Sequence, residues 1–156
     1  MDPFTQALFA FGEPAVFITL ICATGIGLII GAIPGLSVNI AVALAVPLTI
    51  FMPTDQSLVL LIGLYGSGIF GGSVSAILLN APGTPASAAT IFDGYPMARR
   101  GEAGEAIGVT TVMSFIGGFI GIGVLALAAP MVSDFALRFQ PRDYMLLAIL
   151  GILLVG

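Results

Sequence analysis

Histidine and tryptophan are absent from this sequence, and cysteine occurs once, as Cys22 within an apolar run. Without histidine and with one cysteine, the chain can build neither a metal site from these residues nor a disulfide framework. Four basic residues against eight acidic ones leave no positive surface, so we expect no nucleic-acid partner. We also expect no metal centre and no organic cofactor.

The long apolar stretches also lack the side chains that an intramembrane enzyme would use. An acid, a base or an activated nucleophile would have to lie at membrane depth, where ionisable residues mark function. No acidic pair and no basic residue lies inside these stretches, and their serines have no evident base beside them. The sequence therefore predicts a protein that is not an enzyme and has no catalytic residues.

Apolar side chains are abundant: 58% of the residues are hydrophobic, 8% are charged, and the mean hydropathy is +1.16. Soluble domains carry about 25% charged residues, so these values predict an integral membrane protein of the all-α class. Its 21 glycines suit helices that pack closely in lipid. Gly68 with Gly72, and Gly117 with Gly121, have the four-residue spacing of such contacts.

A hydrocarbon core about 30 Å thick takes about 20 helical residues to cross, and this length divides the chain. We expect residues 1–156 to form one transmembrane domain, a polytopic bundle with membrane segments at 14–33, 38–52, 57–80, 106–129 and 144–156. The second segment is short for a crossing, so it is either the second half of a broken helix or a span that uses the break to finish crossing. The last one is shorter than a crossing needs, so we expect a partial chain.

The more polar parts of the chain separate these membrane segments. Residues 1–12 space their apolar side chains near the helical period and are expected to form an interfacial helix. Residues 93–105 are the most polar stretch and are expected to form an aqueous loop. Residues 131–143 mix aromatic and charged side chains, which predicts an interfacial connecting helix.

Two Pro-Gly breaks interrupt the uncharged stretches: AIPGLSVN (Ala32 to Asn39) and NAPGTPASAAT (Asn80 to Thr90). Each unsatisfied backbone group facing lipid costs several kcal/mol, so irregular backbone survives at membrane depth only where protein buries it or where it lines a wet cavity. Two such breaks in a short chain predict a polar site within the membrane. Residues 80–92 are accordingly expected to form a re-entrant segment.

Simpler interpretations of the breaks remain open at this point. Pro34-Gly35 can be an ordinary kink, because transmembrane helices tolerate proline. The stretch from Pro82 to Pro85 can be a loop outside the membrane, since Asp93 follows within reach of the surface. Asn39 and Asn80 can bond across helices instead of contacting a ligand.

Three segments together resemble one known family: GLIIGAIPGL (Gly27 to Leu36), YGSGIFGGSVSAILLNAPGTPASAAT (Tyr65 to Thr90) and DGYPMARRGEAGEAIG (Asp93 to Gly108). In this order they resemble the large transmembrane subunit of the tripartite tricarboxylate transporters. The resemblance covers most of the chain and corresponds to the N-terminal half of the family's two inverted halves. In one place the sequence departs from the family: Ser37-Val38 stand where relatives often have Gly-Pro.

The resemblance implies a multi-pass protein of the bacterial inner membrane that takes up citrate or a related carboxylate with sodium as the coupling ion. It also implies two partners, a small membrane subunit and a periplasmic substrate-binding protein. The missing half of the site would come from further sequence, a second subunit or another copy of the chain. The alternative is a non-transporting scaffold or a channel-forming oligomer, because a short glycine-rich helical chain can assemble symmetrically.

A carboxylate site in this chain would have no lysine or arginine, because no membrane segment contains one. Backbone N–H groups at half-helix N-termini, each end equivalent to roughly half a positive charge, would hold the anion together with hydroxyl and amide groups. The substrate-binding candidates are Gly35, Ser37, Asn39, Asn80, Pro82, Gly83, Thr84 and Ser87. Oxygen ligands for sodium are expected at Ala32, Pro34, Asn39, Asn80 and Thr90.

Two further expectations concern orientation and the second break. Arg99 and Arg100 favour a cytoplasmic side for their loop, although Arg138 and Arg142, one span later, favour the same side for theirs. At the second break, Gly83→Leu is expected to abolish substrate binding while the protein stays folded.

Overall fold

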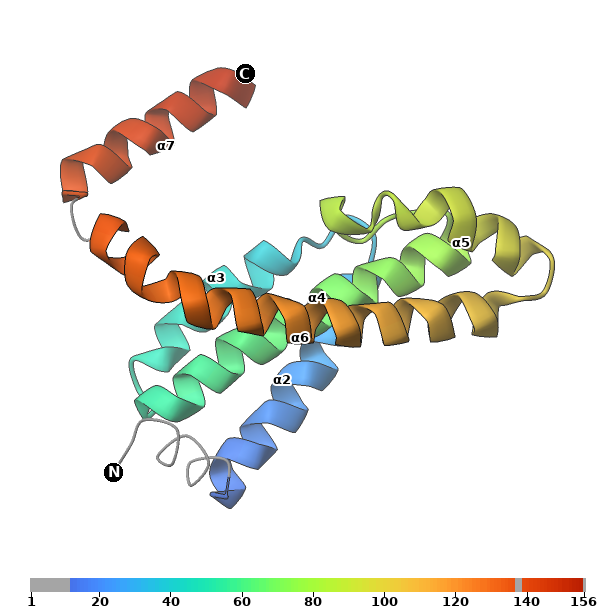
Figure 1. The fold of residues 1–156 in the computed structure, drawn as a ribbon, viewed down its shortest axis with the longest axis horizontal. Coiled ribbons are helices and arrows are strands. Elements are labelled where there is room, and N and C mark those ends of the chain that lie inside the picture. Colours follow the sequence, from blue (N-terminus) through green and yellow to red (C-terminus); the bar gives the residue numbers. More distant parts are fainter. Residues whose placement is uncertain (1–11, 137–138, 156) are drawn as a thin grey trace. The chain divides into compact units, whose positions relative to one another are not determined.

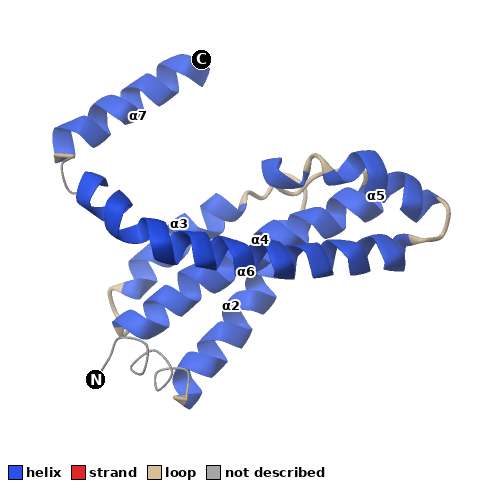
Figure 2. Cartoon of the chain, viewed as in Figure 1, coloured by secondary structure: helices blue, strands red, loops and turns tan. Residues whose placement is uncertain are grey.

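The computed structural model describes residues 12–136 and 139–155, and this part of the chain is helical with no strand (Figures 1 and 2). Its helices are α2 (Pro14–Ala32), α3 (Val38–Thr49), α4 (Thr54–Leu79), the short 3₁₀ helix η1 (Pro85–Ser87), α5 (Thr90–Arg99), α6 (Ala103–Ala136) and α7 (Pro141–Val155). The all-α class is therefore confirmed. The expected interfacial helix at 1–12 lies outside the described residues except for Gly12, which stands in a turn.

Three of the described helices are long and apolar enough to cross a membrane: Pro14–Ala32, Thr54–Leu79 and the part of α6 from Ala103 to Ser133. Helix α3, with 12 residues, is about 18 Å long and falls short of a hydrocarbon core of about 30 Å. It ends at Thr49, three residues before the expected limit of its segment.

The chain divides into two compact units, residues 1–113 and 114–156, and α6 passes from the first into the second. In the second unit, α6 continues through Pro130 to Ala136, where we expected a separate connecting helix to begin at residue 131. A proline inside an apolar helix removes one donor without ending the helix. A β-carbon at Gly117 or Gly121 would meet nothing within 4 Å in the described chain, so the expected packing there is not seen.

Helices α2 and α4 pack through small residues in the first unit. A β-carbon on Gly27 would meet the side chain of Ser67 and the carbonyl of Leu64, and one on Gly31 would meet the backbone of Gly68. The contacting residue numbers increase along both helices together, so α2 and α4 are parallel. Gly27 and Gly31 have the four-residue spacing that lets helix backbones approach closely.

Helix α3 runs antiparallel to α4. Its first residue, Val38, packs against Gly68, Ala45 joins the core with Leu64, and the Ser57 hydroxyl donates to the Thr49 carbonyl at 3.2 Å. Because Gly68 is the fifteenth of the 26 residues of α4, the break before α3 lies near the middle of that helix. The first Pro-Gly break therefore stands at mid-helix level rather than at either end of α4.

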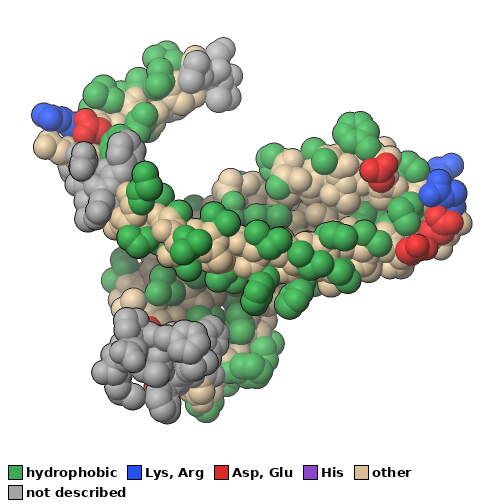
Figure 3. Space-filling view, viewed as in Figure 1, with side chains coloured by type: hydrophobic (Ala, Val, Ile, Leu, Met, Phe, Trp, Pro, Cys, Tyr) green, Lys and Arg blue, Asp and Glu red, His purple; other side chains and the backbone are tan. Residues whose placement is uncertain are grey.

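The polar stretch at 93–105 is more ordered than the expected aqueous loop. Helix α5 continues to Arg99, and only Arg100 to Glu102 form the turn before α6 begins at Ala103. Alanine, methionine and arginine are good helix formers, so a polar composition did not prevent the helix. Basic and acidic side chains gather at this turn (Figure 3), where Arg100 pairs with Glu102 at 3.1 Å.

Candidate functional site

After α4 ends, the chain of the second break folds back beside the helix instead of running away from it. Asn80 ends α4 in the left-handed conformation, with φ of 56°, which asparagine tolerates better than most residues. The Gly83 N–H then donates to the Gly72 carbonyl at 3.4 Å, so the chain has turned back beside the helix. Gly72 lies eight residues before Asn80, which is about 12 Å along a helix.

Thr84 and Ser87 hold the returning segment through a reciprocal capping box. The Ser87 hydroxyl donates to the Thr84 carbonyl at 2.8 Å and accepts from the Thr84 amide at 3.3 Å and hydroxyl at 3.2 Å. Ser87 is 1% exposed. One hydroxyl has one hydrogen and two lone pairs, so the hydrogen-bonding capacity of Ser87 is filled.

The first break is a turn followed by a capped helix start. Gly35 adopts φ of 92°, a left-handed conformation that glycine reaches without a steric penalty. The Ser37 hydroxyl accepts from the Asn39 amide at 3.2 Å and so caps α3. Serine is a favoured N-cap, so Ser37 gives α3 a local signal to begin at Val38.

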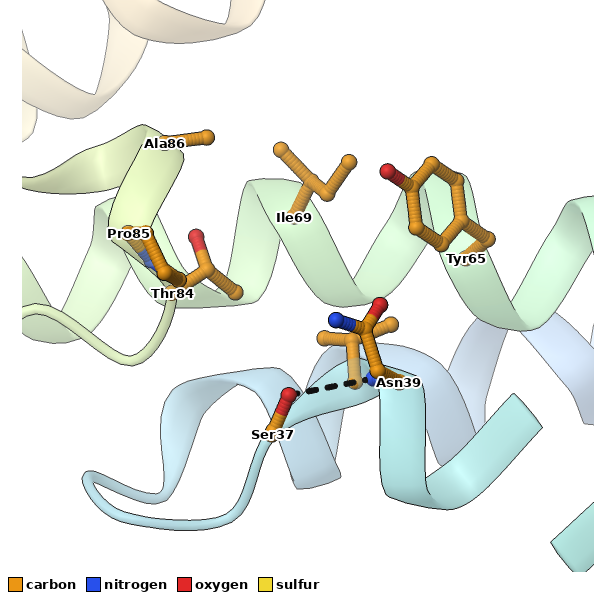
Figure 4. Close-up of a pocket in the computed structure, with 8 residues that line it drawn as sticks. Ser37, Asn39, Tyr65, Ile69, Thr84, Pro85 and Ala86 are labelled. Atoms are coloured by element: carbon orange, nitrogen blue, oxygen red, sulfur yellow. Dashed lines mark hydrogen bonds between the residues drawn. The ribbon is translucent and has the colours of Figure 1, made fainter. Parts of the chain in front are cut away.

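The two breaks meet at a cavity of about 200 Å³ (Figure 4). Its lining comes from the start of α3, the middle of α4 and the start of η1: Ser37, Val38, Asn39, Tyr65, Ile69, Thr84, Pro85 and Ala86. Tyr65 and Ile69 are the twelfth and sixteenth of the 26 residues of α4, so the cavity lies near the middle of the helix.

The cavity offers neutral hydrogen-bonding groups and no charged side chain among its lining residues. Ser37 and Thr84 are already engaged in caps, whereas the side-chain carboxamide of Asn39 and the hydroxyl of Tyr65 make no hydrogen bond within the described chain. Ile69 and Pro85 add apolar surface. Such a cavity can bind a small polar solute through neutral donors while its apolar wall covers a carbon skeleton.

Three of the predicted site residues line this cavity: Ser37, Asn39 and Thr84. The other candidates lie outside its lining: Ala32, Pro34, Gly35, Asn80, Pro82, Gly83, Ser87 and Thr90. Gly83 is wedged between the Gly31 carbonyl and the Cα of Gly72, so Gly83→Leu would disrupt helix packing. The expectation that this variant stays folded was therefore wrong.

Five lining residues were not among the predicted site residues: Val38, Tyr65, Ile69, Pro85 and Ala86. Tyr65 and Ile69 stand four residues apart on the glycine-rich helix α4, the spacing of one helix face. That spacing was visible in the sequence, but nothing local indicated that this face of α4, rather than another, would meet the two breaks.

The profile of the Tripartite tricarboxylate transporter TctA family matches residues 17–156. The chain belongs to this family. Tripartite tricarboxylate transporter TctA proteins are transporter components and not enzymes, and together with the apolar helices this makes the chain a membrane protein.

A relative from Agrobacterium vitis, described as an uncharacterized 52.8 kDa protein in the TAR-I ttuC' 3' region, is 39% identical over 134 residues. The match covers 85% of this chain and 27% of the relative, so the chain spans about a quarter of that relative's length. No solved structure matches the chain.

Proposed function

We propose that this chain is the substrate-binding part of the membrane subunit of a secondary active transporter for tricarboxylates or related carboxylates. The observation that carries the proposal is the meeting of the two Pro-Gly breaks at one cavity beside the middle of α4. Ser37 and Asn39 come from the first break and Thr84 from the second, 45 residues later in the sequence than Asn39. Family membership supports the same class of function.

The absence of lysine and arginine from the cavity lining favours coupling to sodium. A carboxylate that leaves water needs its charge offset, and neutral donors do this only in part. The carbonyl oxygens of Ala32 and Pro34 accept no hydrogen bond from any described residue. Oxygens freed in this way are the ligands that sodium takes at unwound helices in other transporters.

Re-entry of residues 80–92 into the membrane is part of the proposal. The return of Gly83 to Gly72 supports it, because Gly72 lies seven residues before Leu79, the last residue of a helix long enough to cross. We further propose a second, inverted half supplied by further sequence, another subunit or another copy. A small membrane subunit and a periplasmic substrate-binding protein complete the assembly in the bacterial inner membrane.

The test is binding of citrate to this chain assembled with its second half, purified in lipid nanodiscs and measured by calorimetry in sodium and in potassium buffer. We expect saturable binding that tightens as sodium is raised. Absence of binding of citrate, of the non-hydroxylated tricarballylate and of succinate at high sodium would overturn the proposal. In proteoliposomes, carboxylate flux that neither saturates nor depends on sodium would instead support the channel alternative.

A further inference from the structure

We infer that Tyr65 contacts the substrate directly and that its hydroxyl donates a hydrogen bond to a substrate carboxylate. The inference rests on the proposed function, because it assigns a residue to the carboxylate site proposed above. It adds a side chain from α4 to a site that the breaks alone would build from backbone, hydroxyl and amide groups. Figure 4 shows the Tyr65 hydroxyl turned toward the other lining residues.

The depth of Tyr65 is the first reason. It is the twelfth of the 26 residues of α4, about 17 Å from the start of a helix that can cross the membrane. Tyrosine in membrane proteins gathers at the two interfaces, where its ring meets hydrocarbon and its hydroxyl meets water. A tyrosine near the middle of a spanning helix therefore needs a polar partner for its hydroxyl within the protein.

The hydroxyl has no such partner in the described chain. Tyr65 is 49% exposed, and no hydrogen bond joins its oxygen to another described residue. Ser75 and Thr110, by contrast, donate from helices to carbonyls of the preceding turn, at 3.0 Å and 2.9 Å. A tyrosine hydroxyl lies too far from its own backbone for this, so its partner lies outside the described residues, and a ligand in the cavity can supply it.

The residues around Tyr65 indicate the chemical class of that ligand. Asn39 is the other polar lining side chain without a hydrogen bond, and it comes from α3, across the cavity. Ile69, Val38 and Ala86 also line the cavity, and their apolar surfaces suit a short carbon chain. A small molecule with carboxylates at separated positions of an apolar skeleton satisfies both features.

The experiment measures the Kd of citrate and of tricarballylate for the wild-type protein, Tyr65→Phe and Tyr95→Phe in nanodiscs with saturating sodium. A hydrogen bond to a charged group is worth about ten- to hundredfold in affinity. We expect Tyr65→Phe to weaken both ligands by this factor equally, because both present carboxylates. Tyr95 does not line the cavity, so Tyr95→Phe is the matched control and should bind as wild type does.

Unchanged affinity of Tyr65→Phe, or a loss confined to citrate, would overturn the inference, since the second result would place the hydroxyl of Tyr65 at the hydroxyl of citrate. If the wild-type protein binds neither ligand, the proposed function fails instead.

A second pair of variants, Tyr65→Gln and Tyr65→Leu, separates the loss of the hydrogen bond from the loss of packing. Both remove the ring, but glutamine keeps an N–H donor, so Tyr65→Gln should bind more tightly than Tyr65→Leu. Equal binding by the two would contradict a role as donor.

Discussion

Gly72 of α4 faces Thr84 of the second break so closely that a β-carbon at residue 72 would lie 2.9 Å from both the amide nitrogen and the hydroxyl oxygen of Thr84. One turn earlier on the same helix, Gly68 contacts Val38 of the first break, which is also the first residue of α3. Two glycines four residues apart thus let both breaks pack closely against α4. The cavity is located where it is because these two positions carry no side chain.

Gly72→Ala should therefore distort the second break. The added methyl group has to displace Thr84, and overpacking of this kind costs about 1–3 kcal/mol. We expect a lower thermal unfolding temperature in detergent and weaker citrate binding. Gly66→Ala is the matched control on the same helix, because a β-carbon there meets nothing within 4 Å. Equal unfolding temperatures and equal citrate affinities of the two variants would show that the second break does not pack against Gly72.

The parallel packing of α2 and α4 should depend on Gly27. A β-carbon there would lie 2.5 Å from the Leu64 carbonyl oxygen, and backbone cannot move aside as a flexible side chain can. We expect Gly27→Ala to lower the free energy of unfolding by about 1–3 kcal/mol. Gly25→Ala, on the open side of α2, should cause no loss. Thermal unfolding of both variants in the same detergent decides this, and a stable Gly27→Ala would refute the helix register described above.

Ser87 should act through stability rather than through ligand contact. Removing its hydroxyl in Ser87→Ala leaves the buried Thr84 amide without its partner, which costs about 1–3 kcal/mol. The expected result is a lower unfolding temperature, with citrate affinity preserved below that temperature. Thr111→Val is the control, because the exposed Thr111 hydroxyl bonds only to the Ile107 carbonyl of its own helix. A variant of Ser87 that stays stable and loses affinity would make this residue a ligand contact.

The fold also predicts which loops share a side of the membrane. Asp55 lies in the first turn of α4. Gly94 of α5 packs against Ile77, near the C-terminal end of α4, so the residues that follow Gly94 extend beyond that end. Cysteines introduced by Asp55→Cys and Glu102→Cys, each in a Cys22→Ser background, should therefore react with an impermeant maleimide from opposite sides. We expect Glu102→Cys on the cytoplasmic side, beside Arg100. Labelling of both from one side would mean that α4 does not cross the membrane.

Part of the site could be predicted from the sequence, because the causes of the two breaks are local. A proline has no N–H wherever it stands, so Pro34 and Pro82 indicate irregular backbone by their residue type alone. Ser37, Asn39 and Thr84 were selected for their place beside these breaks, and the structure places all three at the cavity. Ser87 has the same kind of side chain at the same break, but its hydroxyl is consumed by the capping box.

The sequence by itself determined the all-α class, the membrane character and the positions of the two breaks, because composition, helix length and the chemistry of proline and glycine decide these locally. Tertiary structure decided which polar groups face one cavity. Helix α2 covers one face of α4 through Gly27 and Gly31, which leaves the face bearing Tyr65 to the two breaks. No local signal distinguishes these faces, since their assignment depends on backbone contacts between helices about 40 residues apart in the chain.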